Sequence, residues 1–216
     1  MTAKQSVRLQ CETLETRDVP AALTNLFDAA FYLQHNPDVA VAVQRGVITS
    51  EVHFRRIGEA EHRQGNALFD DSFYLSHNPD VAAAVQSGAI RSAFHHFELS
   101  GQFENRPSSE LFDGNNYLNN NPDVRNAVNA GLTTAFSHFF ESGEREDRHG
   151  LTGFNPDVYL DDYPDVRNLV ERGLLSATQH FLLFGELENR HIEDGNDRQS
   201  NLNHLRTVVP QPIPLW

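Results

Sequence analysis

The 216-residue chain has very little of several residues that define common classes of protein. Cys11 is its one cysteine, so neither an intrachain disulfide nor a zinc site built on several cysteines can form. Lys4 is the only lysine among 17 basic residues, and the arginines are scattered among 30 acidic residues. Phosphate binding relies on clustered lysine and arginine. With a net charge of −13 and no such cluster, the chain is not expected to bind nucleic acid.

Long apolar runs and catalytic motifs are also missing. No stretch approaches the ~20 apolar residues that a membrane-spanning helix needs, so no membrane span is expected. The sequence contains no nucleophile elbow, phosphate-binding loop or paired-histidine motif. Apolar residues make up 39 % and charged residues 22 %, which is typical of a folded chain. We therefore expect a folded protein that is not an enzyme and needs no cofactor.

What the chain does have is a pattern that returns every 42 or 43 residues. The stretch YLQHNPDVAVAV begins at Tyr32, and related stretches begin at three later tyrosines: Tyr74, Tyr117 and Tyr159. A period of this length predicts an array of structural repeats. We divide the chain into an N-terminal region (1–24), a helical domain (25–193) and a C-terminal tail (194–216). Within the domain, segments one to four cover 27–68, 69–111, 112–153 and 154–193.

Each segment predicts three short helices. The first helix is expected to be capped by a polar residue that accepts from a free backbone N–H; the four caps are Asp28, Asp70, Asp113 and Asn155. A phenylalanine just before each cap and a tyrosine after it have the spacing of a hydrophobic staple. The first helix should end near His35, because proline disfavours helical geometry in the residue before it.

The Asn-Pro-Asp-Val stretch is interpreted as the start of the second helix. Asn36 is a good N-cap, Pro37 fits the first helical position, and Asp38 places negative charge at the positive helix end. This structural role is preferred over a reactive acid or a calcium ligand at Asp38. In segment four Tyr163 replaces the asparagine, which is expected to weaken that helix by ~1 kcal/mol.

The third helix is expected to begin after a serine or threonine and to end at a glycine; the caps are Thr49, Ser92, Thr134 and Ser176. Helices this short are unstable alone, so neighbouring segments must supply their packing. The predicted fold is all-α, an array of four repeats of about three short helices each.

Two rows of residues are the candidate sites. The first row is a histidine in each segment: His53, His96, His138 and His180. They are spaced along an array, whereas a metal needs three or four ligands around one ion, so we expect structural roles and no metal site. The second row belongs to a closing Gly-x-x-Glu-x-Arg motif, with Glu61 and Arg63 in segment one and with Arg106, Arg148 and Arg190 later.

The arginine row allows two interpretations. Planar guanidinium groups suit acidic polysaccharides, or each arginine pairs with a nearby acid such as Glu61 or the aspartate of a helix start. The excess of acid favours pairing. The net negative charge makes calcium binding a further alternative. The dense loop of alternating acidic ligands that calcium sites use is missing, and residues 193–197 (EDGND) resemble it only weakly.

Segment four ends in consecutive apolar residues that include Phe181, Leu183 and Phe184. Because no fifth segment follows, one face of this turn is expected to be exposed and to contact something else. The apolar, proline-rich end of the tail, which carries Trp216, either folds back onto this face or docks into a partner or a second copy. Both alternatives remain open.

The segments resemble a repeat of the YLxxNPDVAxAV…HF…GxxExR type, found in large secreted and surface proteins of bacteria. The stretch RLQCETLETRDVPAA, from Arg8 to Ala22, is similar to an N-terminal export segment of planctomycete surface proteins; the alternative is a short amphipathic helix that caps segment one. The resemblances imply a location in the cell envelope or outside the cell, and no catalytic or binding residues.

The expected function is a non-enzymatic interaction or structural module of the bacterial surface. Its partners would be other envelope or extracellular proteins, or a second copy of the chain. The alternative is a surface protein that binds an anion, such as an acidic polysaccharide, or calcium.

Overall fold

A computed structural model describes residues 25–185 and 187–190, and this part of the chain is all-α, as predicted. It contains twelve α-helices and, apart from one isolated bridge between Phe112 and Leu151, no β-structure. None of its helices is long and apolar enough to cross a membrane. The export-like region 1–24 and the whole tail, Trp216 included, lie outside the described residues.

Each segment contains three α-helices followed by a π-helical turn. Segment one has α1 (Ala29–His35), α2 (Pro37–Gln44), α3 (Ser50–His53) and η1 (Phe54–Gly58). Segment two has α4 (Asp71–His77), α5 (Pro79–Gln86), α6 (Ala93–His96) and η2 (Phe97–Gly101). Segment three has α7 (Gly114–Asn120), α8 (Pro122–Asn129), α9 (Ala135–His138) and η3 (Phe139–Gly143). Segment four has α10 (Pro156–Asp162), α11 (Pro164–Glu171), α12 (Ala177–His180) and η4 (Phe181–Gly185).

The caps predicted for the first and third helices are confirmed. Oδ1 of Asp28 accepts from the backbone N–H groups of Ala30 and Phe31, and the hydroxyl of Thr49 accepts from that of Val52. Side-chain caps also form at the equivalent residues: Asp70, Asp113 and Asn155 for the first helix, and Ser92, Thr134 and Ser176 for the third. These ends depend on local chemistry, which the sequence expresses directly.

The second helix begins at Pro37 with Asn36 at the N-cap position and Asp38 in the first turn, as predicted, but the expected capping bond from the Asn36 side chain does not form. Its Nδ2 donates instead to the carbonyl of Tyr32, 2.7 Å away, at the end of α1. Only Asn36 separates the two helices, so its amide nitrogen lies beside carbonyls that α1 leaves free, and its Oδ1 accepts from Nη1 of Arg63 at 2.8 Å instead of from α2. The expected loss of a cap at Tyr163 is therefore also wrong, because the asparagines at this position make no capping bond.

The third helix also differs from the prediction of one regular helix. After a single α-helical turn the chain widens, and the N–H of Glu59 donates to the carbonyl of Phe54, five residues back, at 2.9 Å. The same widening occurs in each segment. π-Helical turns of this kind are short insertions that local sequence does not indicate.

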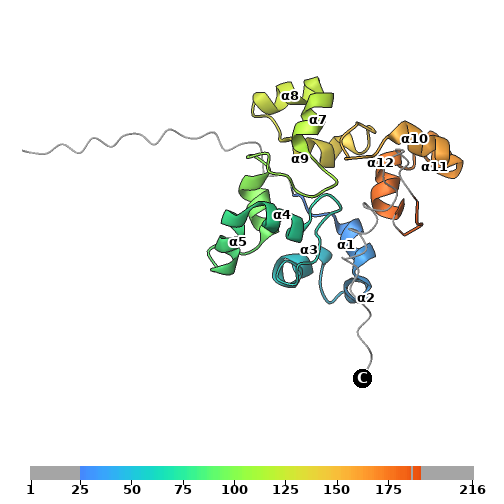
Figure 1. Ribbon diagram of the computed structural model, residues 1–216. Helices are drawn as coiled ribbons and strands as arrows, with labels where there is room; N and C mark the ends of the chain where they lie inside the picture. The colour runs from blue at the N-terminus through green and yellow to red at the C-terminus, as the bar shows by residue number, and fades with distance from the viewer. Residues whose placement is uncertain (1–24, 186, 191–216) are drawn as a thin grey trace, which may run out of the picture.

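The four segments lie around a common centre in chain order (Figure 1). The second helices, α2, α5, α8 and α11, form the outer ends. Segment four returns to segment one, because Nε2 of Gln34 in α1 donates to the carbonyl of Leu183 in η4 at 2.7 Å. The described part is therefore a closed arrangement rather than an extended one.

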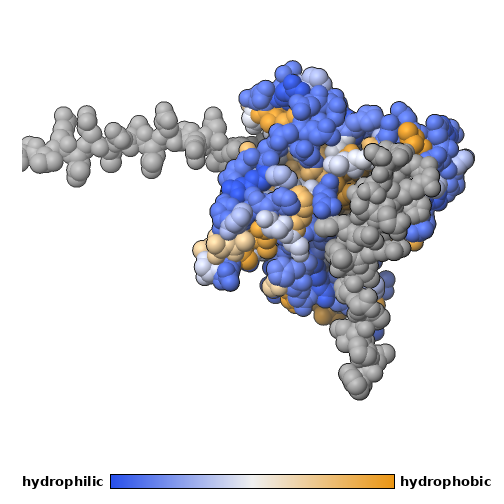
Figure 2. Space-filling view, viewed as in Figure 1, coloured by the Kyte–Doolittle hydropathy of each residue, from blue (hydrophilic) through white to orange (hydrophobic). Residues whose placement is uncertain are grey.

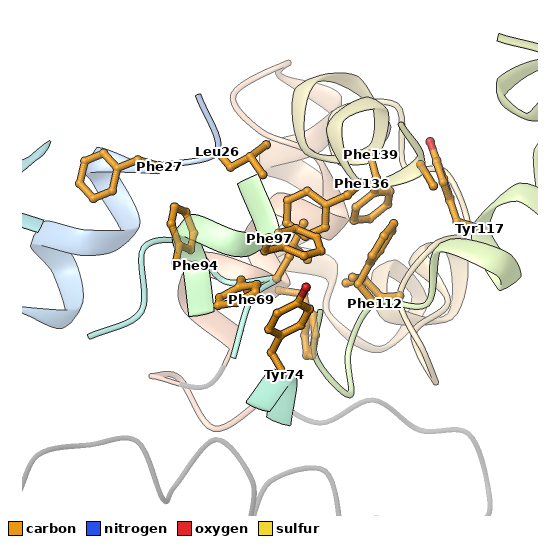
Figure 3. Packing of buried hydrophobic residues seen from close by; sticks show 14 of the residues in the cluster. Leu26, Phe27, Phe69, Tyr74, Phe94, Phe97, Phe112, Tyr117, Phe136 and Phe139 are labelled. Atoms are coloured by element: carbon orange, nitrogen blue, oxygen red, sulfur yellow. The ribbon is translucent and has the colours of Figure 1, made fainter. Parts of the chain in front are cut away.

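Aromatic rings fill the centre and link segments one to three (Figure 3). Rings of Phe54 and Phe94 lie 5.0 Å apart across the first junction, which we define as the contact between segments one and two. Rings of Phe97 and Phe136 lie 4.7 Å apart across the second junction, between segments two and three. Edge-to-face pairs at these distances add to the stabilisation that burial provides.

Candidate functional site

A buried tyrosine in the first helix of each segment contacts the histidine that ends the third α-helix. The hydroxyl of Tyr32 lies 2.9 Å from Nδ1 of His53. The same contact forms at 2.9, 2.9 and 3.0 Å in the other segments: Tyr74 with His96, Tyr117 with His138, and Tyr159 with His180. Each pair fastens the first helix of its segment to the third.

The protonation of this pair follows from its surroundings. Burial raises the pKa of Tyr32 to about 12, so its hydroxyl keeps its proton at neutral pH. Burial also lowers the pKa of three of the histidines: His96, His138 and His180. A neutral imidazole has one acceptor nitrogen, so we assign Nδ1 as the acceptor of the tyrosine proton. A tyrosine with a raised pKa is a poor base, and the pair is suited to holding helices together.

The glycine of the closing motif makes room for this tyrosine. A Cβ atom added to Gly58 would overlap the hydroxyl oxygen of Tyr32. Gly101 and Gly143 lie in the same way against Tyr74 and Tyr117. The recurrence of glycine is therefore explained by close approach of the backbone to a side chain.

Arg63 joins the end of segment one to the start of α2. Its Nη1 donates to Oδ1 of Asn36 at 2.8 Å and of Asp38 at 3.0 Å, and its Nε donates to Glu61 at 2.7 Å. Equivalent pairs form in the next two segments: Arg106 with Asp80 and Glu104, and Arg148 with Asp123 and Glu146. The hydrogen bond from Arg63 lowers the pKa of Asp38. Because the acidic partners are exposed, the pairs fix geometry more than they stabilise the fold.

Segment four keeps the arginine but changes one partner. Arg190 pairs with Asp165 at 2.5 Å and with Glu188 at 2.6 Å. Its guanidinium carbon also lies 4.7 Å from the ring centroid of Tyr163, which stands where the other segments have asparagine. A cation–π contact with Tyr163 thus replaces the hydrogen bond that the arginine of each other segment donates to the asparagine side chain.

The histidines do not converge on one point. Each is held by the tyrosine of its own segment, and no group of three or more histidine, cysteine or acidic residues in the described ranges is placed to hold a metal ion. The closing arginines likewise stay in separate segments, each with its own acids. The recurring polar residues therefore form four small clusters rather than one site.

The residue that follows the closing glycine makes contacts that the sequence did not predict. Glu59 accepts from Arg91 at 2.9 Å and from the hydroxyl of Ser92 at 2.6 Å, and both donors belong to segment two. Gln102, at the same position, accepts from the hydroxyls of Thr134 and Ser137 in segment three. The available signal was the regular placement of Glu or Gln 33 or 32 residues before the cap of the next third helix.

The predicted exposed face of segment four is not found. Phe181 is buried, and Leu183 and Phe184 are half-buried. The physical reason is the closed arrangement, in which α1 contacts η4 through the bond from Gln34. The proposed contact at Trp216 lies outside the described residues.

Comparisons of this chain with protein-family models, with curated proteins and with solved structures found no match.

Proposed function

We propose that the four segments are repeats of one unit and that the chain is a non-enzymatic interaction or structural module of the bacterial cell envelope or exterior. The same three helices, the same caps and the same Tyr–His and Arg–Asp contacts in all four segments support the repeat. The proposed location rests on the resemblance of the sequence to bacterial surface proteins.

The observation that carries the proposal is that the recurring polar side chains bond to one another within each segment and hold its helices together. What recurs on the surface instead is an apolar residue directly after a glycine with positive φ. Val47, Leu132 and Leu174 are 74 %, 70 % and 58 % exposed at these places, and Ala89 occupies the fourth. Apolar side chains form separate patches on the largely hydrophilic face in Figure 2. Several similar contacts on one molecule favour multivalent binding to a protein partner.

The alternative is binding of an acidic polysaccharide or calcium. An anion would have to displace Asp38 from Arg63, and calcium would have to displace Arg63 from Asp38. Titration calorimetry of the full chain with each ligand separates the two functions. We expect no heat beyond dilution from either, and saturable heat from one of them would contradict a protein-binding module.

The surface contact is tested directly with a variant. Val47, Leu132 and Leu174 are replaced together by aspartate, and the control carries the same charges at three exposed polar positions: Gln44, Gln86 and Asn129. Each protein is immobilised and offered a detergent extract of the cell envelope of the source bacterium. A protein retained by the wild type and the control but not by the Val47/Leu132/Leu174 variant supports the proposal. Equal retention by all three would contradict it.

A further inference from the structure

The outer side of α2 differs from that of the other second helices. Among the second helices of the described ranges, only α2 exposes a large apolar side chain, that of Val41, which is 45 % exposed. The equivalent residues are Ala83 in α5, Asn126 in α8 and Asn168 in α11. α2 packs on α1 and α3 of its own segment and forms an outer end of the molecule (Figure 1). The side that carries Val41 is therefore open to contact with another molecule.

The same side of α2 carries opposite charges at its two ends. Residues three or four positions apart lie on one side of a helix, and four residues of α2 follow this spacing: Asp38, Val41, Ala42 and Arg45. We call these four residues the α2 face. Asp38 lies in the first turn, Arg45 directly follows the last helical residue, and both are exposed. The α2 face thus has an acid at one end, a base at the other and two aliphatic side chains between them.

The two charged ends are not neutralised to the same extent within the chain. Nη1 of Arg63 donates to Oδ1 of Asp38 at 3.0 Å, but Nε of the same arginine donates to Glu61 at 2.7 Å. Two acids therefore share one arginine, and this end keeps a negative charge. In the part of the chain that the structure describes, no acid lies within ion-pair distance of the Arg45 side chain. The other end therefore keeps its positive charge.

These ends are complementary to each other when two copies of α2 lie side by side in antiparallel orientation. A two-fold axis that passes between Val41 and Ala42 places Arg45 of each copy beside Asp38 of the other, since both residues are equally far from the axis. It also places Val41 of each copy beside Ala42 of the other. Side chains of this size let two helix axes approach to about 8 Å. A two-fold contact uses one surface twice, so each ion pair forms twice.

We propose that the α2 face is a self-association surface, through which two copies of the chain pair by antiparallel α2 helices. The distribution of charge favours a second copy at this place. Segment one carries four arginines and five acidic residues, whereas segment four carries three arginines and eight acidic residues. Repulsion between two copies is therefore smallest where segment one meets segment one. This contact goes beyond the proposed function, because it uses neither a partner protein nor the exposed residues after the glycines.

The equivalent helix of segment four provides a comparison within the chain. α11 also has an acid and a base at its ends, Asp165 and Arg172, but Asn168 stands at its centre. Arg190 donates to both carboxylate oxygens of Asp165, whereas Arg63 donates to only one oxygen of Asp38. α11 therefore lacks the apolar centre, and its acid is already bound on both oxygens. We do not expect two copies of α11 to pair.

The size of the surface limits the strength of the contact. An eight-residue helix is about 12 Å long, so two copies of α2 bury much less than the ~1,200 Å² of a stable complex. The dimer should therefore be weak and depend on concentration. The net charge of −13 also opposes it, but in ~0.15 M salt charges more than about 8 Å apart are largely screened, whereas the ion pairs in contact are not.

Sedimentation equilibrium of the full chain tests the proposal, from about 10 µM to about 1 mM protein in ~0.15 M salt. The mass of the wild type should rise from 24.4 kDa towards twice that value. Val41→Asp places like charges beside the axis, and Arg45→Asp places them at both ends of the face. Each should lower the association constant at least about tenfold. Arg172→Asp, the equivalent change in α11, is the matched control and should associate like the wild type.

A cross-link tests the orientation of the two helices. In a Cys11→Ser background, Val41→Cys lies next to the axis in both copies and should form a disulfide between them on oxidation, whereas Asn168→Cys should not. A wild type that stays monomeric to about 1 mM would overturn the proposal. Equal weakening by Arg45→Asp and Arg172→Asp, or equal cross-linking at the two cysteine positions, would also overturn it. None of these results depends on whether an envelope protein binds the chain.

Discussion

The first junction and the third junction, which we define as the contact between segments three and four, use equivalent positions in different ways. At the first, Glu59 accepts from two residues of segment two, and Phe94 stacks edge-to-face on Phe54. At the third, no donor to the Glu144 carboxyl is found in the described ranges, a threonine replaces the phenylalanine, and Asp147 accepts from the backbone N–H of Thr178 at 2.9 Å instead. Contacts inside each segment recur almost unchanged, whereas contacts between segments do not. Folding of a segment and attachment of that segment are therefore set by different residues.

The largest expected effect comes from removing the ring at the first junction. Phe94→Ala should lower the free energy of unfolding by about 3–5 kcal/mol, because Phe94 is 1 % exposed and contacts rings of two segments. Urea unfolding measures this change. Thr178→Val, at the equivalent position of the third junction, should be neutral or stabilising, since it removes an unpartnered hydroxyl. A large loss in Thr178→Val would show that the two junctions are alike.

The acidic residues at the two junctions should respond with opposite signs. Glu59→Gln removes the charge that Arg55 and Arg91 both contact, and should lower the free energy of unfolding by about 2 kcal/mol. Glu144→Gln should raise it at pH 8, because burial and the charge of Asp28 make ionisation of the wild-type carboxyl unfavourable in the folded chain. Urea unfolding at pH 8 compares the free energy of unfolding of both variants with that of the wild type. If both variants are destabilised, the acidic residues at the two junctions do not differ in their effect on stability.

The buried His180 and the half-buried His96 and His138 should make the protein sensitive to acid. Burial lowers the pKa of His96, His138 and His180 below 6.5, so the unfolded chain takes up protons first as the pH falls. Their contribution to stability is present above pH 6.5 and is lost below it. The thermal midpoint of Glu144→Gln, which removes the opposing effect of that carboxyl, should therefore rise from pH 5 to pH 7. A midpoint that falls over this range would contradict neutral histidines in the folded state.

Helix ends could be predicted from the sequence, whereas contacts between helices could not. Helix starts at Asp28 and Thr49 and the helix end at His35 were predictable, because caps and prolines act on their immediate neighbours. The side-chain bond of Asn36 and the π-helical turns were not, because they depend on where a neighbouring helix places its carbonyls and its tyrosine.

The candidate site divides in a similar way. Pairing of Arg63 with Asp38 and Glu61 was one of two interpretations, and the excess of acid favoured it. The bond between Tyr32 and His53 was missed, although both residues recur 21 or 22 residues apart, because a recurring spacing does not say which side chains face one another. The weak third junction was not predictable, since it rests on departures from the repeated pattern.

The smallest effect concerns a partly exposed pair at the first junction. Nδ1 of His62 lies 3.0 Å from Asp71, and this contact raises the pKa of His62. The pair therefore stabilises the fold below pH 6.5, and that contribution is lost as the pH rises through the raised pKa. His62→Asn, which copies Asn105 of the next segment, should cost a few tenths of a kcal/mol at pH 6 and nothing at pH 9. An equal loss at both values would mean that the charge of His62 does not contribute.

Truncation after segment three tests most directly whether the ring pairs of the first two junctions are enough to hold segments one to three together without segment four. A chain that ends at Gly153 keeps the ring pairs at 5.0 and 4.7 Å and the bridge between Phe112 and Leu151. Far-ultraviolet circular dichroism during heating should show a helical chain that unfolds in one cooperative transition, at a somewhat lower temperature than the full chain. An unfolded or non-cooperative truncated chain would show that segment four is an integral part of the core, and would contradict the difference between the junctions.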